Sequence, residues 1–589
     1  MPIWLIAMAV LIVATGPAEA GVRRVWAVHD GDKIERDARD HPAGTRNTAW
    51  DGRGVRLFAA RNEVIAFQVI VEADDEGVNA LSLRLRELAG DRDRITYRPP
   101  ATDPADYVDR PIQIFAVNYM QVTMPSHASW VFDRTSPAAP PDPTGWKPVQ
   151  LVPEHARRGR GGLPVAVGPN QNQAIWIEVY VGRTRAAGQY RGTIEIEADA
   201  ARRTLSIALE VFDFTLPDEN SMHAMLYYSP SQPELYHGRN LDPAYHRMAH
   251  RHRAELVHAY DESSVQHSWG RFSGTDFTRA SGYEGPGEGV GNVIVPRSFY
   301  GPGRDFDERS KAWAQSDAWM TFLRAKLPRA ITFLYMPDEP RPAEYERIRT
   351  LAGNIHSNPG AGRSLPVFVT SRYVEPLDAA VDIWCSGPKG FKLDQVASER
   401  ARGREYWFYN GGRPAGGAIT IDAPATDARV TIWAAFKHDV RVYFYWHSVH
   451  WRHNSQKPSD RDQNVWAETI TFDNRRQEKR SPDDQGYIHG DGVLMYPGEE
   501  RLHPDQDRGL PGPVATVQLA NFRRGLQDHQ YLTLARKLGL HAVVDKVVTA
   551  IVPKVFSDAG ERVSFPETGD PYEAARLELA RAIASAGAR

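Results

Sequence analysis

The sequence predicts a multidomain fold of the β plus α/β class, with an N-terminal β-sandwich, a (β/α)8 TIM-like barrel and C-terminal helices. Short alternating or β-branched runs fill the chain to about Leu216. Strand-like runs then alternate with helical stretches, which is the pattern of a parallel sheet, and helical periodicity takes over from Pro513. The predicted parts are a signal peptide at residues 1–20, followed by 21–217, 218–512 and 513–589.

Residues 1–20 are typical of an export signal. The apolar run 3–14 is too short to span a bilayer comfortably, and Ala18-Glu19-Ala20 gives a small-x-small cleavage pattern. No Lys or Arg precedes the run, so an uncleaved anchor is the alternative. We expect an exported protein, periplasmic or extracellular, with no membrane contact after cleavage.

Composition narrows the classes of partner. The 71 basic and 74 acidic residues are mixed along the chain and leave a net charge of -3, so we expect neither nucleic acid nor an anionic membrane as a partner. Cys385 is the only cysteine, which excludes an intramolecular disulfide and a thiolate metal cluster. With 589 residues the chain can bury more than one core, and its oligomeric state stays open.

Eight strand-like runs separated by helical stretches predict the barrel. The candidate strands are residues 224–228, 264–267, 292–296, 331–336, 367–370, 381–385, 405–409 and 442–446. The candidate helices are residues 243–258, 308–325, 342–355 and 427–438. Helices after Pro513 are expected to close or flank this barrel, whose active site would lie at the C-terminal ends of its strands.

The sharpest chemical feature is a pair of adjacent carboxylates, Asp338 and Glu339, directly after the apolar run 331–336. At the end of a barrel strand such a pair can do acid–base chemistry. The alternative is structural: Asp338 caps the following helix and Glu339 fills its first turn, where both interact well with the helix dipole.

Aromatic residues gather at the ends of the other candidate strands. Their rings can stack on the C–H faces of sugars while hydroxyl and indole N–H groups reach polar partners. For each single ring, packing in the core is an equally good interpretation. The aromatic residues expected to bind substrate are Tyr228, Trp384, Tyr409, Tyr445 and Trp446.

Two further motifs carry reactive side chains. Gly490-Asp491-Gly492 through Tyr496 places an acid and a phenol beside glycines that allow tight turns, so Asp491 and Tyr496 join the expected substrate-binding set, although any turn could look alike. His447, His450 and His453 invite a metal interpretation, but no cluster of carboxylates accompanies them. We expect no metal and no cofactor, and the chain has no G-x-S-x-G nucleophile motif.

Taken together, the motifs resemble glycoside hydrolase family 123 and the wider DUF4091 group over nearly the whole mature chain. The segments that carry the resemblance are 211–217 (VFDFTLP), 338–340 (DEP), 490–498 (GDGVLMYPG) and 521–532 (NFRRGLQDHQYL). The resemblance implies a retaining β-N-acetylgalactosaminidase acting on a glycan or oligosaccharide, with the substrate's own 2-acetamido oxygen as nucleophile. Glu339 would be the general acid and then the base, and Asp338 would orient the acetamido group.

Adjacent carboxylates suit this division of roles. An ordinary retaining pair lies about 5 to 5.5 Å apart across the scissile bond, and side chains of neighbouring residues usually diverge. Two alternatives stay open. In one, the chain is a glycosidase of other specificity in which Asp382, Asp491 or Glu405 complements Glu339. In the other, it is a non-catalytic carbohydrate-binding protein on the same scaffold.

Overall fold

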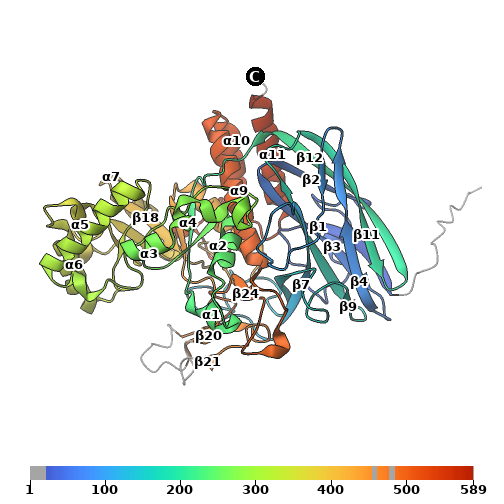
Figure 1. The fold of residues 1–589 in the computed structure, drawn as a ribbon, viewed down its shortest axis with the longest axis horizontal. Helices are drawn as coiled ribbons and strands as arrows, with labels where there is room; N and C mark the ends of the chain where they lie inside the picture. The colour runs from blue at the N-terminus through green and yellow to red at the C-terminus, as the bar shows by residue number, and fades with distance from the viewer. Residues whose placement is uncertain (1–20, 454–460, 476–484, 588–589) are drawn as a thin grey trace, which may run out of the picture.

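The computed structural model describes residues 21–453, 461–475 and 485–587 of the chain (Figure 1). The predicted signal peptide lies outside these residues. Within them, none of the helices combines the length and the apolar character that crossing a bilayer requires.

The N-terminal part consists mostly of two sheets. The first has the strand order β1-β3-β10-β7-β8 and is antiparallel throughout; its strands are β1 Val22–His29, β3 Glu63–Ala73, β7 Ile112–Val122, β8 Gly145–Pro153 and β10 Asn172–Val181. The second follows the order β2-β12-β11-β4-β9, with β5 beside β11 and β6 beside β5; its strands are β2 Gly54–Arg61, β4 Val78–Leu85, β5 Glu87–Gly90, β6 Arg94–Thr96, β9 Val165–Val167, β11 Gly188–Ala198 and β12 Ala201–Thr215.

The two sheets share one apolar core, to which Trp26 and Trp176 of the first and Ile196 and Leu209 of the second contribute. Strands β11 and β12 alternate between buried and exposed residues, because their outer face meets solvent. Every residue of β3 is buried. The first sheet is therefore covered on both faces.

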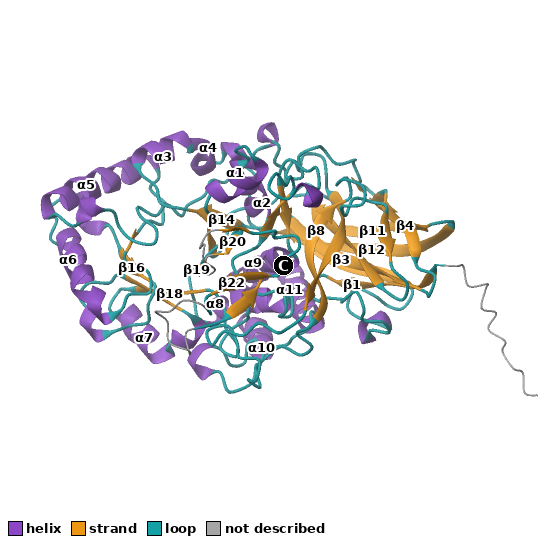
Figure 2. Ribbon diagram, turned by 90° about the horizontal axis from the view of Figure 1, so that it is seen from below, coloured by secondary structure: helices purple, strands orange, loops and turns teal. Residues whose placement is uncertain are grey.

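The middle of the chain forms a parallel sheet of seven strands in the order β14-β13-β19-β18-β17-β16-β15. These are β13 His223–Tyr227, β14 Ala254–Val257, β15 Leu334–Tyr335, β16 Val367–Val369, β17 Ile383–Ser386, β18 Glu405–Tyr409 and β19 Val442–Tyr445. The helices of this part, several of which surround the strands in Figure 2, are α1 Ser231–His237, α2 Asp242–Arg251, α3 Glu262–His267, α4 Trp269–Ser273, α5 Arg309–Lys326, α6 Tyr345–His356, α7 Leu393–Ala401 and α8 Thr426–Lys437. The sheet curls, since the ring of Tyr335 in β15 meets that of Phe444 in β19 at 6.4 Å across three intervening strands.

The predicted closed (β/α)8 barrel is wrong, because the edge strands β14 and β15 do not pair with each other. The segment 292–296, expected to be the third strand, makes only an isolated bridge from Ile294 to Ile331. The Glu255 carboxylate accepts the N–H groups of Val293 and Ile294 at 2.8 and 2.9 Å. These donors are thus taken by a side chain instead of a β14 carbonyl, and the sheet stays open.

Two further element predictions are wrong. The candidate strand 264–267 lies in helix α3, whose N-cap Asp261 accepts the N–H of Ser264 while the Ser264 hydroxyl accepts the N–H of Asp261. The candidate helix 243–258 is α2 followed by the buried strand β14. Arg253, between them, has a φ of 60°, which ends the helical path.

The C-terminal part contains short antiparallel pairs and three helices. Their bounds are β20 Arg452–His453, β21 Arg461–Asp462, β22 Ile470–Asp473, β23 Tyr487–His489, β24 Met495–Pro497, β25 Pro513–Ala515, α9 Val517–Lys537, α10 His541–Ile551 and α11 Asp570–Gly587. In Figure 1 these helices stand between the N-terminal sheets and the parallel sheet. Helix α9 is buried all round along residues 517–532, so it serves as core between the two.

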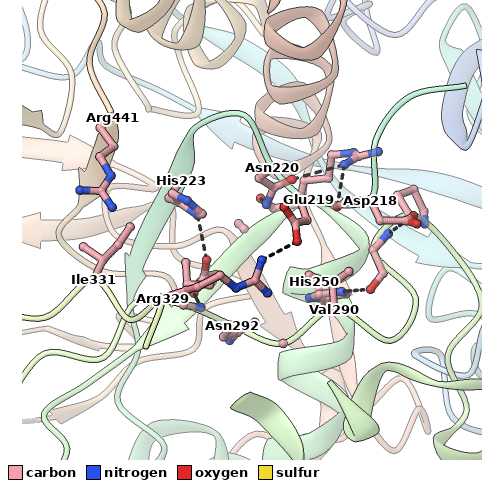
Figure 3. A pocket seen from close by; sticks show the side chains of 17 residues that line it. Asp218, Glu219, Asn220, His223, His250, Val290, Asn292, Arg329, Ile331 and Arg441 are labelled. Carbon is pink, nitrogen blue, oxygen red and sulfur yellow. Dashed lines mark hydrogen bonds and ion pairs between the residues drawn. The ribbon is translucent and has the colours of Figure 1, made fainter. Parts of the chain in front are cut away.

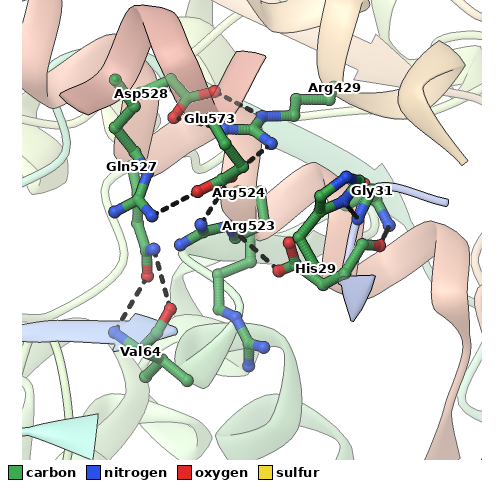
Figure 4. Close-up of polar contacts among 12 residues, drawn as sticks. His29, Gly31, Val64, Arg429, Arg523, Arg524, Gln527, Asp528 and Glu573 are labelled. Atoms are coloured by element: carbon green, nitrogen blue, oxygen red, sulfur yellow. Dashed lines mark hydrogen bonds and ion pairs between the residues drawn. The ribbon is translucent and has the colours of Figure 1, made fainter. Parts of the chain in front are cut away.

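A buried network of ion pairs ties these parts together (Figure 4). Arg429 of α8 donates to both carboxylate oxygens of Asp528 in α9 at 2.6 and 3.0 Å and to Glu573 of α11 at 2.8 Å. We call this network, completed by the N-terminal residues, the ion cluster; it comprises Asp30, Glu63, Arg429, Arg524, Asp528, Glu573 and Arg576.

Candidate active site

Asp338 and Glu339 lie just past β15, at the C-terminal ends of the parallel strands, and both are exposed. Oδ1 of Asp338 accepts the hydroxyls of Tyr335 at 2.7 Å and Thr370 at 2.8 Å. Oγ1 of Thr370 also accepts the backbone N–H of Glu339 at 2.9 Å. One threonine hydroxyl from the end of β16 therefore fixes both acidic residues.

The pair does not cap a helix. The next helical turn, residues 342–344, has Arg341 as its N-cap, and α6 begins only at Tyr345. Glu339 has a φ of 44°, in the left-handed region that a residue with a Cβ adopts at a cost of about 1–2 kcal/mol. Such an observed outlier at the end of a strand points to a functional constraint on the Glu339 side chain.

Tyr409, at the end of β18, donates its hydroxyl to Oε1 of Glu339 at 2.6 Å. Burial raises the pKa of Tyr409 well above its ordinary value, and the Glu339 charge adds to the rise. The phenol thus remains protonated and stays a donor. The predicted binding residue Tyr409 is therefore bonded directly to the acidic pair.

Asp491 forms a second acidic point at the same end of the sheet. Its Oδ1 accepts Nε1–H of Trp446 at 2.9 Å and the hydroxyl of Tyr445 at 3.2 Å. Burial raises the pKa of Asp491 to about 6, and these two bonds oppose the rise. Gly492 has a φ of 73°, and a Cβ there would come within 2.9 Å of Trp446, so the motif needs glycine at this turn.

Tyr300 lies near both acidic points. Its hydroxyl donates to the Trp446 carbonyl at 2.6 Å, and its backbone φ of 53° is another left-handed outlier. Burial raises the pKa of this phenol well above its ordinary value. The charges of Asp338, Glu339 and Asp491 and the nearby Tyr227 add to the rise, so all three carboxylates lie close enough to act electrostatically on this phenol.

Half-buried aromatic rings lie beside these groups at the C-terminal strand ends, a region that we call the mouth of the sheet. We call these rings the aromatic wall; they are Tyr227, Phe299, Tyr300, Tyr409 and Trp446. The Tyr227 ring stacks on Phe299 at 4.7 Å and meets Tyr300 edge-on at 4.7 Å. Polar tips and apolar faces exposed together suit a sugar ring.

Four of the predicted binding residues are buried and do not reach this mouth. Tyr445 is 1% exposed, and its ring lies 6.1 Å from that of Phe522 in α9. Trp384 is fully buried and donates Nε1–H to Glu399 of α7 at 2.9 Å. Tyr228 is fully buried against Tyr245 of α2, with 5.8 Å between the ring centroids. Tyr496 is 1% exposed and packs on Trp466. Side chains alternate between the faces of a strand, and here the outer face is covered by helices, so ring content alone did not say which face each ring takes.

The alternative carboxylates separate in the same way. Asp382 accepts the backbone N–H of Val367 at 2.8 Å at the N-terminal end of β16, and Glu405 begins β18 and pairs with Arg441. Both lie at the strand ends opposite Glu339. Asp491 is the one of the three at the Glu339 end.

The opposite end of the sheet holds a cavity of about 160 Å³, shown in Figure 3. Its polar groups already pair with one another, as in His223 with Glu255 at 3.1 Å and Arg329 with Glu219 at 2.5 Å. Self-paired charges at the N-terminal ends of the strands are typical of a stabilising region.

The sequence analysis did not single out Tyr300, Thr370 or Tyr335. Thr370 lies at the C-terminal end of a candidate strand, and Asp338 follows another candidate strand. This shared position at strand ends is the sequence signal that could have identified Thr370. The described residues contain no group of three or more His, Cys, Asp or Glu side chains arranged to hold a metal ion, and the His453 side chain lies outside the description.

No protein-family model matches the sequence, and no curated protein matches it either. Among solved structures, a family 123 glycoside hydrolase from Clostridium perfringens, reported in work on glycolipid glycan hydrolysis, aligns over 96% of this chain and 98% of its own, at a TM-score of 0.61 and 12% identity. The chain has the fold of that family 123 enzyme. This confirms, for the fold, the resemblance seen in the sequence motifs.

Two other solved structures are much less similar. A β-glucuronidase from Parabacteroides merdae covers 65% of this chain and 45% of its own, with a TM-score of 0.23 and 10% identity. A β-galactosidase-like protein from Bacteroides fragilis covers 71% and 54%, with a TM-score of 0.22 and 11% identity. Similarity at this level supports no conclusion about the chain.

Proposed function

We propose that this chain is an exported glycoside hydrolase, a retaining β-N-acetylhexosaminidase of the N-acetylgalactosaminidase type. The observation that carries the proposal is the hydroxyl-bonded pair Asp338 and Glu339, exposed beneath the aromatic wall at the C-terminal strand ends. The shared fold with a family 123 glycoside hydrolase supports it.

In this mechanism the acetamido oxygen of the substrate attacks C1 while Glu339 donates its proton to the departing glycosidic oxygen. Tyr335 and Thr370 both bond Oδ1 of Asp338, so Oδ2 can accept the acetamido N–H and offset the positive charge that develops on nitrogen. Glu339 then takes a proton from water, whose oxygen opens the bicyclic intermediate at C1 and restores the β-configuration.

A second candidate is a glycosidase of other sugar specificity, in which Asp491 is the nucleophile or stabiliser opposite Glu339. The observation that favours it is the position of Asp491 at the same end of the sheet, together with its pKa of about 6.

The test is hydrolysis, by the full exported chain, of chromogenic β-N-acetylgalactosaminide, β-N-acetylglucosaminide and plain β-galactoside in parallel. We expect turnover of an acetamido sugar and little or none of the galactoside. The structurally similar family 123 enzyme from Clostridium perfringens was reported in work on glycolipid glycan hydrolysis. A glycolipid oligosaccharide is therefore the first natural substrate to try. Preference for the plain galactoside would favour the Asp491 mechanism, and no turnover at all would contradict both.

A further inference from the structure

His447, two residues past β19, has its tautomer fixed by the backbone. Its Nδ1 accepts the N–H groups of Ser448 and Val449, each at 3.1 Å. Backbone N–H groups only donate, so Nδ1 must present a lone pair and the ring proton must sit on Nε2.

This imidazole is also held neutral. The residue is 6% exposed, and burial lowers the pKa of His447 well below its ordinary value, with His450 adding to the drop. Burial thus disfavours protonation, and the proton on Nε2 occupies the position at which that nitrogen would bind a metal. What remains is a single neutral N–H donor.

The structure leaves that donor unused. Nε2 of His447 has no hydrogen-bond partner among the described residues. The atom is also not fully buried, so a ligand can reach it. Its ring meets Tyr227 edge-on at 5.1 Å and Trp446 at 5.7 Å. His447 is thus seated in the aromatic wall, where a ligand would find it.

Its place relative to the acidic pair defines which edge of a sugar it meets. β19, which leads to His447, and β15, which leads to Asp338 and Glu339, are separated by β18, β17 and β16 in the curled sheet. From this order we infer that His447 lies on the side of the mouth away from the acidic pair. The acidic pair serves C1 and the C2 acetamido group. The far edge of a pyranose carries C3, C4 and C6.

We propose that His447 is a specificity-determining residue that donates Nε2–H to a hydroxyl at C3, C4 or C6 of the bound sugar. The inference rests on the proposed function of the site. It deepens that function by adding a neutral donor opposite the reacting carbon.

The test uses two variants of the full chain. His447→Phe keeps the ring and removes the donor, whereas His447→Gln places an amide N–H near the Nε2 position. For a chromogenic β-N-acetylgalactosaminide we expect kcat/KM to fall about tenfold in the Phe variant, as for a lost hydrogen bond between neutral groups, and to recover largely in the Gln variant.

Substrate analogues lacking the C3, C4 or C6 hydroxyl identify the partner. For the wild type, kcat/KM should be about tenfold lower with one of these analogues than with the full substrate. For His447→Phe, kcat/KM should be the same with that analogue as with the full substrate. The inference would be overturned if, for all three analogues, the loss from the missing hydroxyl and the loss from His447→Phe were additive. Unchanged kinetics in the Phe variant beside an active wild type would also overturn it.

A wild type inactive on every sugar would instead contradict the proposed function. Ring-nitrogen NMR of the histidines then tests His447 independently. The wild-type signals that disappear in His447→Phe belong to His447. They should report an Nε2–H tautomer between about pH 5 and 8, where an ordinary histidine titrates. They should also shift when N-acetylgalactosamine is added. A titrating ring, or one that ignores the sugar, would overturn the inference.

Discussion

Two acid-rich regions of this molecule hold their carboxylates in opposite ways. In the ion cluster, Glu573 accepts N–H groups from Arg429, Arg524 and Arg576 and is 5% exposed. In the mouth, Asp338 is exposed and is bonded by two hydroxyls.

The difference fits a structural role for the ion cluster and the reactive role proposed for Asp338 and Glu339. Burial raises the pKa of Glu573, but the three arginines outweigh burial and hold the pKa well below its ordinary value, so the group is a permanent anion. Hydroxyl donors orient Asp338 without neutralising it. The second arrangement suits an acid that must meet a substrate's nitrogen or proton, and the first suits an acid that holds parts of the fold together.

The largest contrast is expected from Glu339→Gln. Removing the general acid should lower kcat by about 10²–10⁴-fold on a substrate with a poor leaving group, with no change in thermal stability because the side chain is exposed. The matched control is Glu346→Gln, an exposed acid of α6 paired with Arg349. Steady-state kinetics and thermal melts of both variants check this; equal activity of the two variants would remove Glu339 from the chemistry.

Glu573→Gln should show the reverse pattern. Loss of one partner leaves buried arginines uncompensated, which costs about 3–5 kcal/mol of unfolding free energy. The control on the same helix is Glu578→Gln, whose pair with Lys546 is exposed, and about 0–1 kcal/mol is expected there. Denaturant unfolding measures both, and similar losses would mean that the ion cluster does not hold the parts of the fold together.

His29 near the ion cluster should give a stability contribution that depends on pH. Burial lowers its pKa, but Asp32, Asp570 and Glu573 outweigh burial and raise the pKa from 6.5 to about 9. A raised pKa stabilises fully below the unfolded value and the gain is lost as pH rises toward 9.

The wild type should therefore exceed His29→Gln by about 3 kcal/mol at most near pH 6 and lose that margin by about pH 9. Taking the difference cancels other titrating groups. The control is His267→Gln, at an exposed histidine of α3. A margin that stays constant across this range would contradict the charge assigned to His29.

Thr370→Val tests the hydroxyl that links the acidic pair, and its effect should be the smallest. Loss of the bonds to Asp338 and to the Glu339 N–H should lower kcat about tenfold with little change in KM, since orientation and not binding is lost. Thr370→Ser keeps the hydroxyl and should stay near the wild type. If Ser and Val behave alike, Thr370 does not position the pair.

Periodicity predicted most elements of this fold. Residues 405–409 form β18 with the expected bounds. Strand-like runs after Leu216 form a parallel sheet, as their alternation with helical stretches predicted. Closure of the sheet could not be predicted, because it depends on the Glu255 side chain taking N–H groups from residues about 40 positions later in the sequence.

The acidic pair was visible in the sequence because it directly follows a strand. The positions of the binding rings were harder to predict. Tyr227 and Tyr228 are adjacent in sequence but point to opposite faces of the sheet: Tyr227 lies in the mouth and Tyr228 packs beneath α2. Both faces of a covered parallel strand are apolar, so composition does not mark the inner one. Tyr300 lies on a loop, where a left-handed backbone aims its ring, and no periodic signal reports such a position.

The central claim is that Asp338 and Glu339 act together with the substrate's own acetamido group. Inhibition by an N-acetylgalactosamine-derived thiazoline, a mimic of the bicyclic intermediate, tests it most directly. The account predicts competitive inhibition at least about 10²-fold tighter than by N-acetylgalactosamine itself, weakened strongly in Asp338→Asn. A wild type that hydrolyses glycosides but binds the thiazoline no better than the free sugar would contradict it.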